Sequence, residues 1–270
     1  MSRVDPIVLA DTITKLGPEA RGAVIVSSSH GGRYAGTLAL MVAPRGFVLN
    51  DAGVGRDRAG IGCLALAEQY GVAAATVAHT SCRIGEVADM WQRGTISHVN
   101  RQAAAAGLGP GESCMGAAAL FSRLRPPAPF AIEKPADARN MLNEPGWKSA
   151  IVLIDSAAGV LPEDAGQIVI TGSHGALVGG KATMALQVDA LVAVFNDAGG
   201  GADGCGFTRL PSLDRRRIAG LTVAASSARI GEARSGYEDG IISAVNEFAR
   251  GMGARVGDRL RPFVEKMARE

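Results

Sequence analysis

The chain of 270 residues carries the same run of short motifs twice. Ser29-His30-Gly31 returns 144 residues later as Ser173-His174-Gly175, and Asn50-Asp51-Ala52-Gly53 returns 146 residues later as Asn196-Asp197-Ala198-Gly199. The apolar runs that end in Asp11 and Asp155 match as well, and so do the stretches 81–86 and 227–232. Motifs that recur in the same order at a near-constant offset indicate a tandem duplication. We therefore expect two similar units related by a pseudo-twofold axis.

A proline-rich stretch separates the two copies. Prolines at positions 126, 127, 129, 135 and 145 exclude a continuous helix or a central strand in this part of the chain. We therefore place the first α/β unit at residues 1–125, a linker at residues 126–147 and the second α/β unit at residues 148–270.

Short apolar runs alternate with longer amphipathic stretches in each copy. Apolar runs without polar interruption favour strands buried on both faces, and their alternation with helices favours a parallel sheet. The sequence thus predicts a duplicated three-layer α/β fold with a mostly parallel sheet in each repeat. The expected strands are 7–10, 23–26, 47–49, 74–78, 151–154, 168–171, 191–195 and 221–224, and the expected helices include 59–70, 87–106 and 233–250.

Charge and composition exclude several classes of function. The 28 basic and 26 acidic side chains nearly cancel and aromatic residues make up only 4% of the chain, so we expect no nucleic-acid partner. No uncharged apolar run approaches the roughly 20 residues of a membrane span. The four cysteines form no CxxC pair, so we expect neither a zinc-knuckle site nor a disulfide framework. We expect a cytoplasmic protein that acts on a small molecule and binds no membrane, and we allow for a homo-oligomer.

The repeated motifs all follow directly after predicted strands. In open parallel sheets, ligands bind outside the carboxyl ends of the strands, so these polar side chains are candidates for a site. The candidate acid–base groups are His30 and His174, with Asp51 and Asp197 to orient the imidazole or to move a proton themselves. The candidate substrate-binding residues are Ser29, Ser173, Asn50, Asn196, Ser81, Ser227, Arg83, Arg229, Asp11 and Asp155.

Each candidate also has a structural interpretation. Asp51 can shape an Asx turn, and Arg83 can pair with Glu86 three residues later. An arginine that points into the crevice instead would suit a substrate carboxylate. A carboxylate beside the candidate histidines would raise their pKa above about 6.5. His79 and His98 stand opposite alanines in the second copy, and we interpret them as incidental.

Two motif matches point to other classes of protein. Residues 199–204 fit the GxGxxG pattern of dinucleotide sites, but Arg58 replaces the third glycine in the first copy. The pattern of SerHisGly after one strand and AspAla after the next resembles the caspase-like peptidases. That resemblance implies a cysteine nucleophile, and Gly53 and Gly199 stand at its position.

A metal site is an alternative to pure acid–base chemistry. His30, Asp11 and Asp51 are ligand types that a divalent metal accepts, but no HxH or HExxH spacing supports such a site. We therefore expect no cofactor.

The candidate residues favour a small-molecule enzyme that uses His and Asp for general acid–base chemistry on a carboxylate- or carbonyl-bearing substrate. We expect hydrolysis of an amide or lactam first, and lyase or isomerase chemistry second. The alternative is a non-catalytic protein that binds a small anion or regulates a partner. The copies differ after SerHisGly, where Arg33-Tyr34 correspond to Leu177-Val178, so we expect them to be unequal in function.

Overall fold

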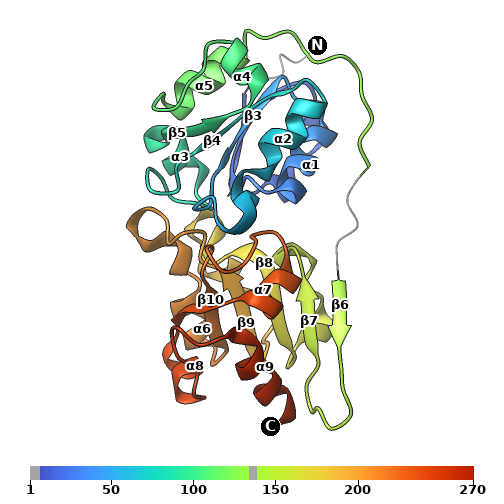
Figure 1. Cartoon of the computed structure of the whole chain (residues 1–270), viewed down its shortest axis with the longest axis vertical. Coiled ribbons are helices and arrows are strands. Elements are labelled where there is room, and N and C mark those ends of the chain that lie inside the picture. The colour runs from blue at the N-terminus through green and yellow to red at the C-terminus, as the bar shows by residue number, and fades with distance from the viewer. Residues whose placement is uncertain (1–6, 134–138) are drawn as a thin grey trace. The chain divides into compact units, whose positions relative to one another are not determined.

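A computed structural model describes residues 7–133 and 139–270 (Figure 1). The chain forms two compact units. Unit 1 comprises the described residues within 1–54, 58–135 and 201–203, and unit 2 comprises those within 55–57, 136–200 and 204–270. Residues 1–6 of the expected first unit and residues 134–138 of the expected linker lie outside the described residues.

A five-stranded sheet forms the centre of unit 1. Its strands lie in the order β1 (Ile7–Ala10), β2 (Val24–His30), β3 (Gly46–Asn50), β4 (Ala73–Val77) and β5 (Ile96–Val99). The first four run parallel, and β5 pairs antiparallel with β4. Every residue of β2, β3 and β4 is buried, as expected for parallel strands covered on both faces.

Helices cover both faces of this sheet (Figure 1). On one face, α1 (Arg33–Met41) and α2 (Gly62–Gln69) build one apolar core with the strands. On the other face, α3 (Val87–Arg93), α4 (Arg101–Ala105) and α5 (Cys114–Phe121) build a second core. Three short 3-10 helices, Ile13–Lys15, Pro18–Ala20 and Arg56–Ile61, complete the connections.

Unit 2 repeats this arrangement around a six-stranded sheet. The strand order is β11 (Ile242–Val245), β10 (Ala219–Val223), β9 (Val192–Asn196), β8 (Ile168–His174), β7 (Ile151–Ile154) and β6 (Arg139–Leu142). The strands from β7 to β10 run parallel, and the two edge strands are antiparallel to their neighbours.

The helices of unit 2 also lie on both faces of its sheet. One core contains α7 (Ala233–Asp239), α8 (Glu247–Gly251) and α9 (Leu260–Arg269), and the opposite core contains α6 (Leu210–Arg215). The short 3-10 helices are Ala157–Gly159, Pro162–Asp164, Val178–Gly180, Ala182–Met184 and Ala202–Phe207. The prediction of tandem α/β units with mostly parallel sheets is thus confirmed, with β1 to β5 matching β7 to β11 in order and direction.

The expected helices at 87–106 and 233–250 are wrong, because each contains an antiparallel strand between two short helices. In unit 1, α3 ends at Arg93, because the next residue, Gly94, leaves the helical conformation with ψ near 128°. The next helix starts only after β5, where the Asn100 side chain accepts the backbone N–H of Ala103. Asparagine favours such a cap over a helix interior, so the continuous helix is broken twice.

The two units also differ in the segment after β2 and β8. Unit 1 has the nine-residue helix α1 there, whereas unit 2 has only the 3-10 turns Val178–Gly180 and Ala182–Met184. Gly179 and Gly180 adopt φ values of 61° and 65°. Two adjacent glycines in the left-handed region prevent an α-helix from forming in unit 2.

Strand β6 lies inside residues 126–147, the stretch assigned to the linker from its prolines. The Arg139 guanidinium on β6 donates to both carboxylate oxygens of Asp164, whose side chain is 2% exposed. This carboxylate also accepts the backbone N–H of Leu161 at 2.8 Å. Burial raises the pKa of Asp164, but the hydrogen bond from Arg139 outweighs burial and holds the pKa below its usual value.

We expect Arg139→Ala to lower the free energy of unfolding by about 3 kcal/mol, because it leaves the buried Asp164 carboxylate without its cation. Urea unfolding at neutral pH measures the loss. The loss should shrink as the pH falls through the lowered pKa of Asp164, since a protonated carboxyl needs no cation. Arg234→Ala is the control, because it removes only an exposed pair with Glu238 and should cost about 0.5 kcal/mol. Equal losses for the two variants would contradict this account.

Candidate functional site

The repeated polar motifs lie at the carboxyl edges of the parallel strands. In unit 1 this edge carries Asp11 after β1, His30 at the end of β2, Asp51 after β3 and His79 after β4. His30 stands in register with Asn50, and His174 stands in register with Asn196 in unit 2. The fold thus brings these motifs to the edge where open parallel sheets bind ligands.

His30 is held as a neutral imidazole. Its Nδ1 accepts the backbone N–H of Gly32 at 3.1 Å, and the residue is only 8% exposed. Burial lowers the pKa of His30 to about 4, the opposite direction from the rise expected beside a carboxylate. At neutral pH the proton therefore resides on Nε2, which makes His30 a hydrogen-bond donor at the sheet edge. His174 is similarly buried, at 6% exposure.

Because the folded protein favours neutral His30, its stability should fall as the pH drops from about 6.5 towards 4. In that range His30 binds a proton in the unfolded chain but not in the folded chain. The free energy of unfolding therefore falls by up to about 3 kcal/mol. Asparagine can still accept the Gly32 N–H but does not titrate. We therefore expect His30→Asn to reduce the slope of the free energy of unfolding against pH in this window. A pKa near 6.5 for the His30 imidazole, measured by NMR titration of the folded chain, would contradict burial of the neutral form.

A carboxylate–imidazole pair stands at the end of β3 and β4. The Asp51 Oδ1 accepts the His79 Nδ1–H at 2.9 Å and also accepts the backbone N–H groups of His79 at 2.9 Å and Gly53 at 3.1 Å. The side chain of Asp51 is 4% exposed and that of His79 is 24% exposed. Burial raises the pKa of Asp51, but the hydrogen bonds from His79 outweigh burial and hold the pKa below its usual value. Asp51 is therefore ionised and orients the ring of His79.

Unit 2 keeps the carboxylate and lacks the imidazole. The Asp197 Oδ1 accepts the backbone N–H groups of Gly199 at 2.9 Å and Ala225 at 2.8 Å, the same two bonds that Asp51 makes. Ala225 occupies the position of His79. His79 was not among the candidate residues, because those recur in both copies and this histidine does not. The signal was a difference: an aspartate repeated in both copies, followed 28 residues later by histidine in the first copy only.

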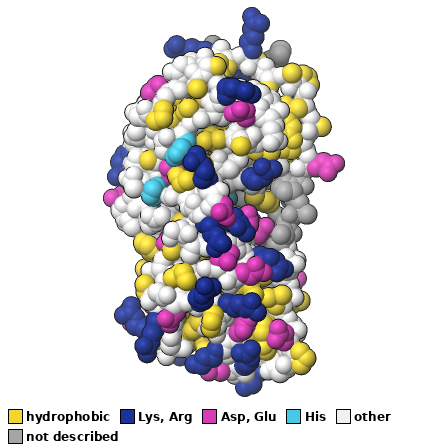
Figure 2. All heavy atoms as spheres, viewed as in Figure 1, with side chains coloured by type: hydrophobic (Ala, Val, Ile, Leu, Met, Phe, Trp, Pro, Cys, Tyr) yellow, Lys and Arg dark blue, Asp and Glu magenta, His cyan; other side chains and the backbone are white. Residues whose placement is uncertain are grey.

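His98 belongs to the same part of unit 1. Its Nδ1 lies 3.1 Å from the Ser97 hydroxyl, which is 3.2 Å from the Thr76 hydroxyl, and a hydrogen bond from Ser97 further lowers the pKa of Asp51. Figure 2 shows histidine rings at the surface, and His79 and His98 are the two histidines that are not buried. In unit 2 an equivalent pair of hydroxyls is 2.9 Å apart, without either histidine. Of the two histidines interpreted as incidental, His79 therefore contacts the Asp51 carboxylate directly, whereas His98 contacts Ser97, which also bonds to that carboxylate.

The other candidate side chains accept backbone N–H groups of the fold. In unit 1, Ser29 accepts from Ile13, Asn50 from Ala52, Ser81 from Thr95 and Asp11 from Val87 at the start of α3. In unit 2, Ser173 accepts from Ala157, Asn196 from Ala198, Ser227 from Ile241 and Asp155 from Ala233 at the start of α7. These bonds shape the turns of both units. Substrate binding by these residues stays a prediction.

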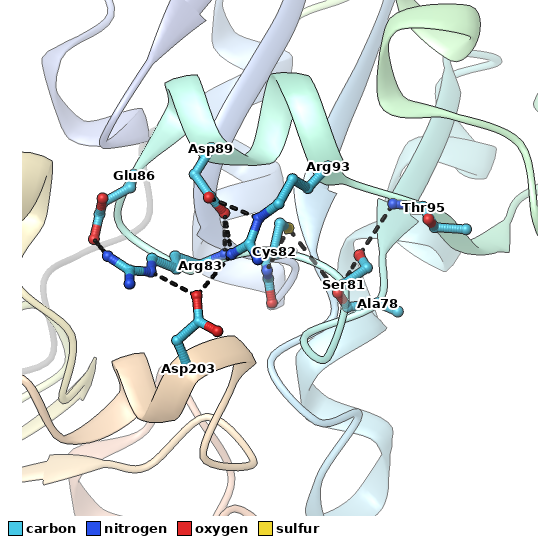
Figure 3. Close-up of polar contacts among 10 residues, drawn as sticks. Ala78, Ser81, Cys82, Arg83, Glu86, Asp89, Arg93, Thr95 and Asp203 are labelled. Carbon is cyan, nitrogen blue, oxygen red and sulfur yellow. Dashed lines mark hydrogen bonds and ion pairs between the residues drawn. The ribbon is translucent and has the colours of Figure 1, made fainter.

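Carboxylates surround the Arg83 guanidinium (Figure 3). Its Nε donates to Asp203 at 3.0 Å, and Nη1 lies 3.5 Å from Glu86. The hydrogen bond to Asp203 is the main cause that raises the pKa of Arg83. In unit 2, Arg229 donates to Glu232 at 2.7 Å and to Asp57 at 2.8 Å. The expected ion pair with the i+3 glutamate is present in both units, so a substrate carboxylate would compete with carboxylates of the chain.

A strained turn follows Asp51. Ala52, Gly53, Val54 and Gly55 have φ values of 48°, 79°, 59° and 66°, and residues 198–201 have values of 52° to 81°. A β-branched residue such as Val54 reaches the left-handed region at a cost of roughly 1–3 kcal/mol, and such strain gathers at functional sites. The turn places the Gly53 N–H on the Asp51 carboxylate, so this strain lies next to the pair with His79.

No protein-family model, curated protein or solved structure matches this chain. Function therefore has to be argued from the site, since a fold alone does not define it. Within residues 7–133 and 139–270, no group of three or more His, Cys, Asp or Glu side chains is placed to hold a metal ion. None of the helices in these ranges has the length and apolar character needed to cross a membrane.

Proposed function

We propose that the chain is a small-molecule enzyme in which His79 and Asp51 perform general acid–base chemistry on a carbonyl- or carboxylate-bearing substrate, with hydrolysis of an amide or lactam as the reaction. The observation that carries the proposal is the 2.9 Å contact between the His79 Nδ1 and the buried Asp51 carboxylate. An ionised carboxylate on Nδ1 fixes the tautomer that leaves Nε2 unprotonated, and this is the arrangement that a general base needs.

The chemistry follows from that tautomer. The His79 Nε2 takes a proton from a water molecule as the water oxygen attacks the carbonyl carbon, and the resulting imidazolium is stabilised by Asp51. When the carbon–nitrogen bond breaks, the imidazolium returns the proton to the leaving nitrogen. The partial exposure of His79 allows water and substrate to reach the ring.

His30 supports the proposal as a hydrogen-bond donor. Its Nε2 carries a proton at neutral pH because Nδ1 is engaged by Gly32 and burial lowers the pKa to about 4. A neutral, buried donor suits a carbonyl oxygen on which negative charge develops. We therefore assign His30 to substrate polarisation and His79 to proton transfer, in place of the base role that the sequence analysis gave to His30.

The two units are unequal in this proposal. Unit 2 has Ala225 at the position of His79, so its Asp197 orients no imidazole there. We assign turnover to unit 1.

The proposal is tested by screening a panel of amides and lactams for hydrolysis and comparing variants on any substrate found. We expect His79→Ala and Asp51→Asn to lower kcat/KM by about 10²- to 10⁴-fold, the usual contribution of a positioned acid–base group. Asp197→Asn is the matched control, because it changes a carboxylate with the same backbone bonds but no imidazole, and it should leave kcat/KM unchanged.

Equal losses of kcat/KM in Asp51→Asn and Asp197→Asn would mean that both carboxylates only stabilise the fold. Full activity in His79→Ala would remove this histidine from the mechanism. Panel compounds that bind but are not hydrolysed would favour the alternative, a ligand-binding protein without turnover.

A further inference from the structure

Unit 2 buries an arginine beside its SerHisGly turn. Arg209 immediately precedes α6, and its backbone N–H donates to the Gly175 carbonyl at 3.0 Å. The residue is 4% exposed. The guanidinium carbon lies 4.7 Å from the centre of the Phe195 ring, one residue before the end of β9. The cation therefore lies near the carboxyl ends of β8 and β9.

The Arg209 guanidinium bonds to main-chain carbonyls rather than to a carboxylate. Its Nε donates to Ala176 at 3.0 Å, and Nη1 donates to Met184 at 2.7 Å and to Ala185. Within the described part of the chain, Arg209 forms no ion pair, and no residue accepts a hydrogen bond from Nη2. A buried charge without a counter-ion is unusual, because no opposite charge offsets its lost hydration.

The pKa of Arg209 reflects the missing countercharge. Burial lowers it to about 10, and no anion acts in the opposite direction. The pKa of Arg83 and that of Arg229 are raised instead, because carboxylates contact these arginines. Of these three arginines, Arg209 is therefore the one whose charge a bound anion would stabilise most.

The buried arginine and the loop that it binds occur together in unit 2. In unit 1, Cys63 stands at the position of Arg209, and α1 stands in place of the loop. A Cβ added to Gly36 of α1 would lie only 2.7 Å from the Cys63 Cβ, so this helix packs too closely for a guanidinium. The unit without this helix is thus the unit that contains the buried cation.

The loop itself has a sequence suited to anions. Gly175, Gly180 and Lys181 have the spacing of phosphate-binding GxxxxGK loops, with Ala182 where such loops carry Ser or Thr. Lys181 is exposed and lies three residues before Met184, whose carbonyl Arg209 binds. Two positive charges are therefore attached to one short glycine-containing loop.

We propose that Arg209 and the loop 176–185 form a second binding site, in unit 2, for the carboxylate or phosphate group of a small molecule. The Arg209 Nη2 donates to an oxygen of the anion, and Lys181 adds the second charge. The anion supplies the countercharge that the described residues do not provide. The site is separate from the Asp51–His79 pair, so it does not depend on the function proposed for unit 1.

Inorganic phosphate and acetate are the probes, with chloride at equal ionic strength as the reference. Thermal unfolding should show that phosphate, acetate or both raise the Tm of the full chain above that in chloride, since a ligand of the folded state stabilises it. Calorimetry should show binding of the effective anion at least about tenfold weaker in Arg209→Met, or about 1.4 kcal/mol. Which anion acts distinguishes a phosphate site from a carboxylate site.

Two further variants keep the test interpretable. Lys181→Ala leaves the carbonyl bonds of Arg209 in place and should also weaken binding, so it replaces Arg209→Met if that variant does not fold. Arg216→Met is the matched control, because Arg216 also donates to nearby carbonyls but is paired with Asp189 at 2.8 Å. It should bind the anion as the unmodified chain does.

The proposal is overturned if neither anion raises the Tm above the chloride reference. It is also overturned if Lys181→Ala and every folded Arg209 variant bind the anion as tightly as the unmodified chain, and Arg209 is then only a clamp for the loop. His79→Ala should retain anion binding in unit 2. Retention there separates failure of this site from failure of the enzymatic proposal.

Discussion

The candidate site depends on one aspartate carboxylate at the end of the third parallel strand of each unit. Asp51 and Asp197 each accept one N–H from the turn that follows their own strand and one N–H from the segment after the neighbouring strand. These bonds connect two adjacent strand ends at the carboxyl edge of the sheet, where open parallel sheets generally bind their ligands. A buried carboxylate that satisfies two backbone donors is constrained in position and charge, so a side chain added beside it is oriented without further support. His79 is such an addition.

Much of the fold follows from local sequence features. The strands were predicted because apolar runs without polar interruption need burial on both faces, and the observed strands begin and end within a few residues of those runs. The two antiparallel strands β5 and β11 were missed, because a short partly buried strand beside an alanine-rich stretch has a pattern close to that of an amphipathic helix. Gly94 and Asn100 were the local signals of a break.

The site was less predictable than the fold, and duplication explains why. Residues that recur in both copies, such as Ser29, Asn50 and Asp11, bond to backbone groups that both units need for their turns and helix starts. Residues that occur in one copy are free of that requirement. His79 in unit 1 and Arg209 in unit 2 are both of this kind. The other copy has Ala225 and Cys63 at these positions, so each residue adds a polar or charged side chain that the other copy lacks. In a duplicated chain, a mismatch between copies therefore carries more information about chemistry than a match does.

Strand β6 shows that the repeated unit and the folding unit need not coincide. The sequence repeat resumes at β7, yet the sheet of unit 2 starts one strand earlier, and Arg139 on that strand neutralises the buried Asp164. A fragment that begins at residue 148, where the repeat pattern alone would place the border, would lose the edge strand β6. Its buried Asp164 carboxylate would then lack the Arg139 guanidinium. The ancestral module and the present domain therefore have different borders, and an excised second half should begin before residue 139.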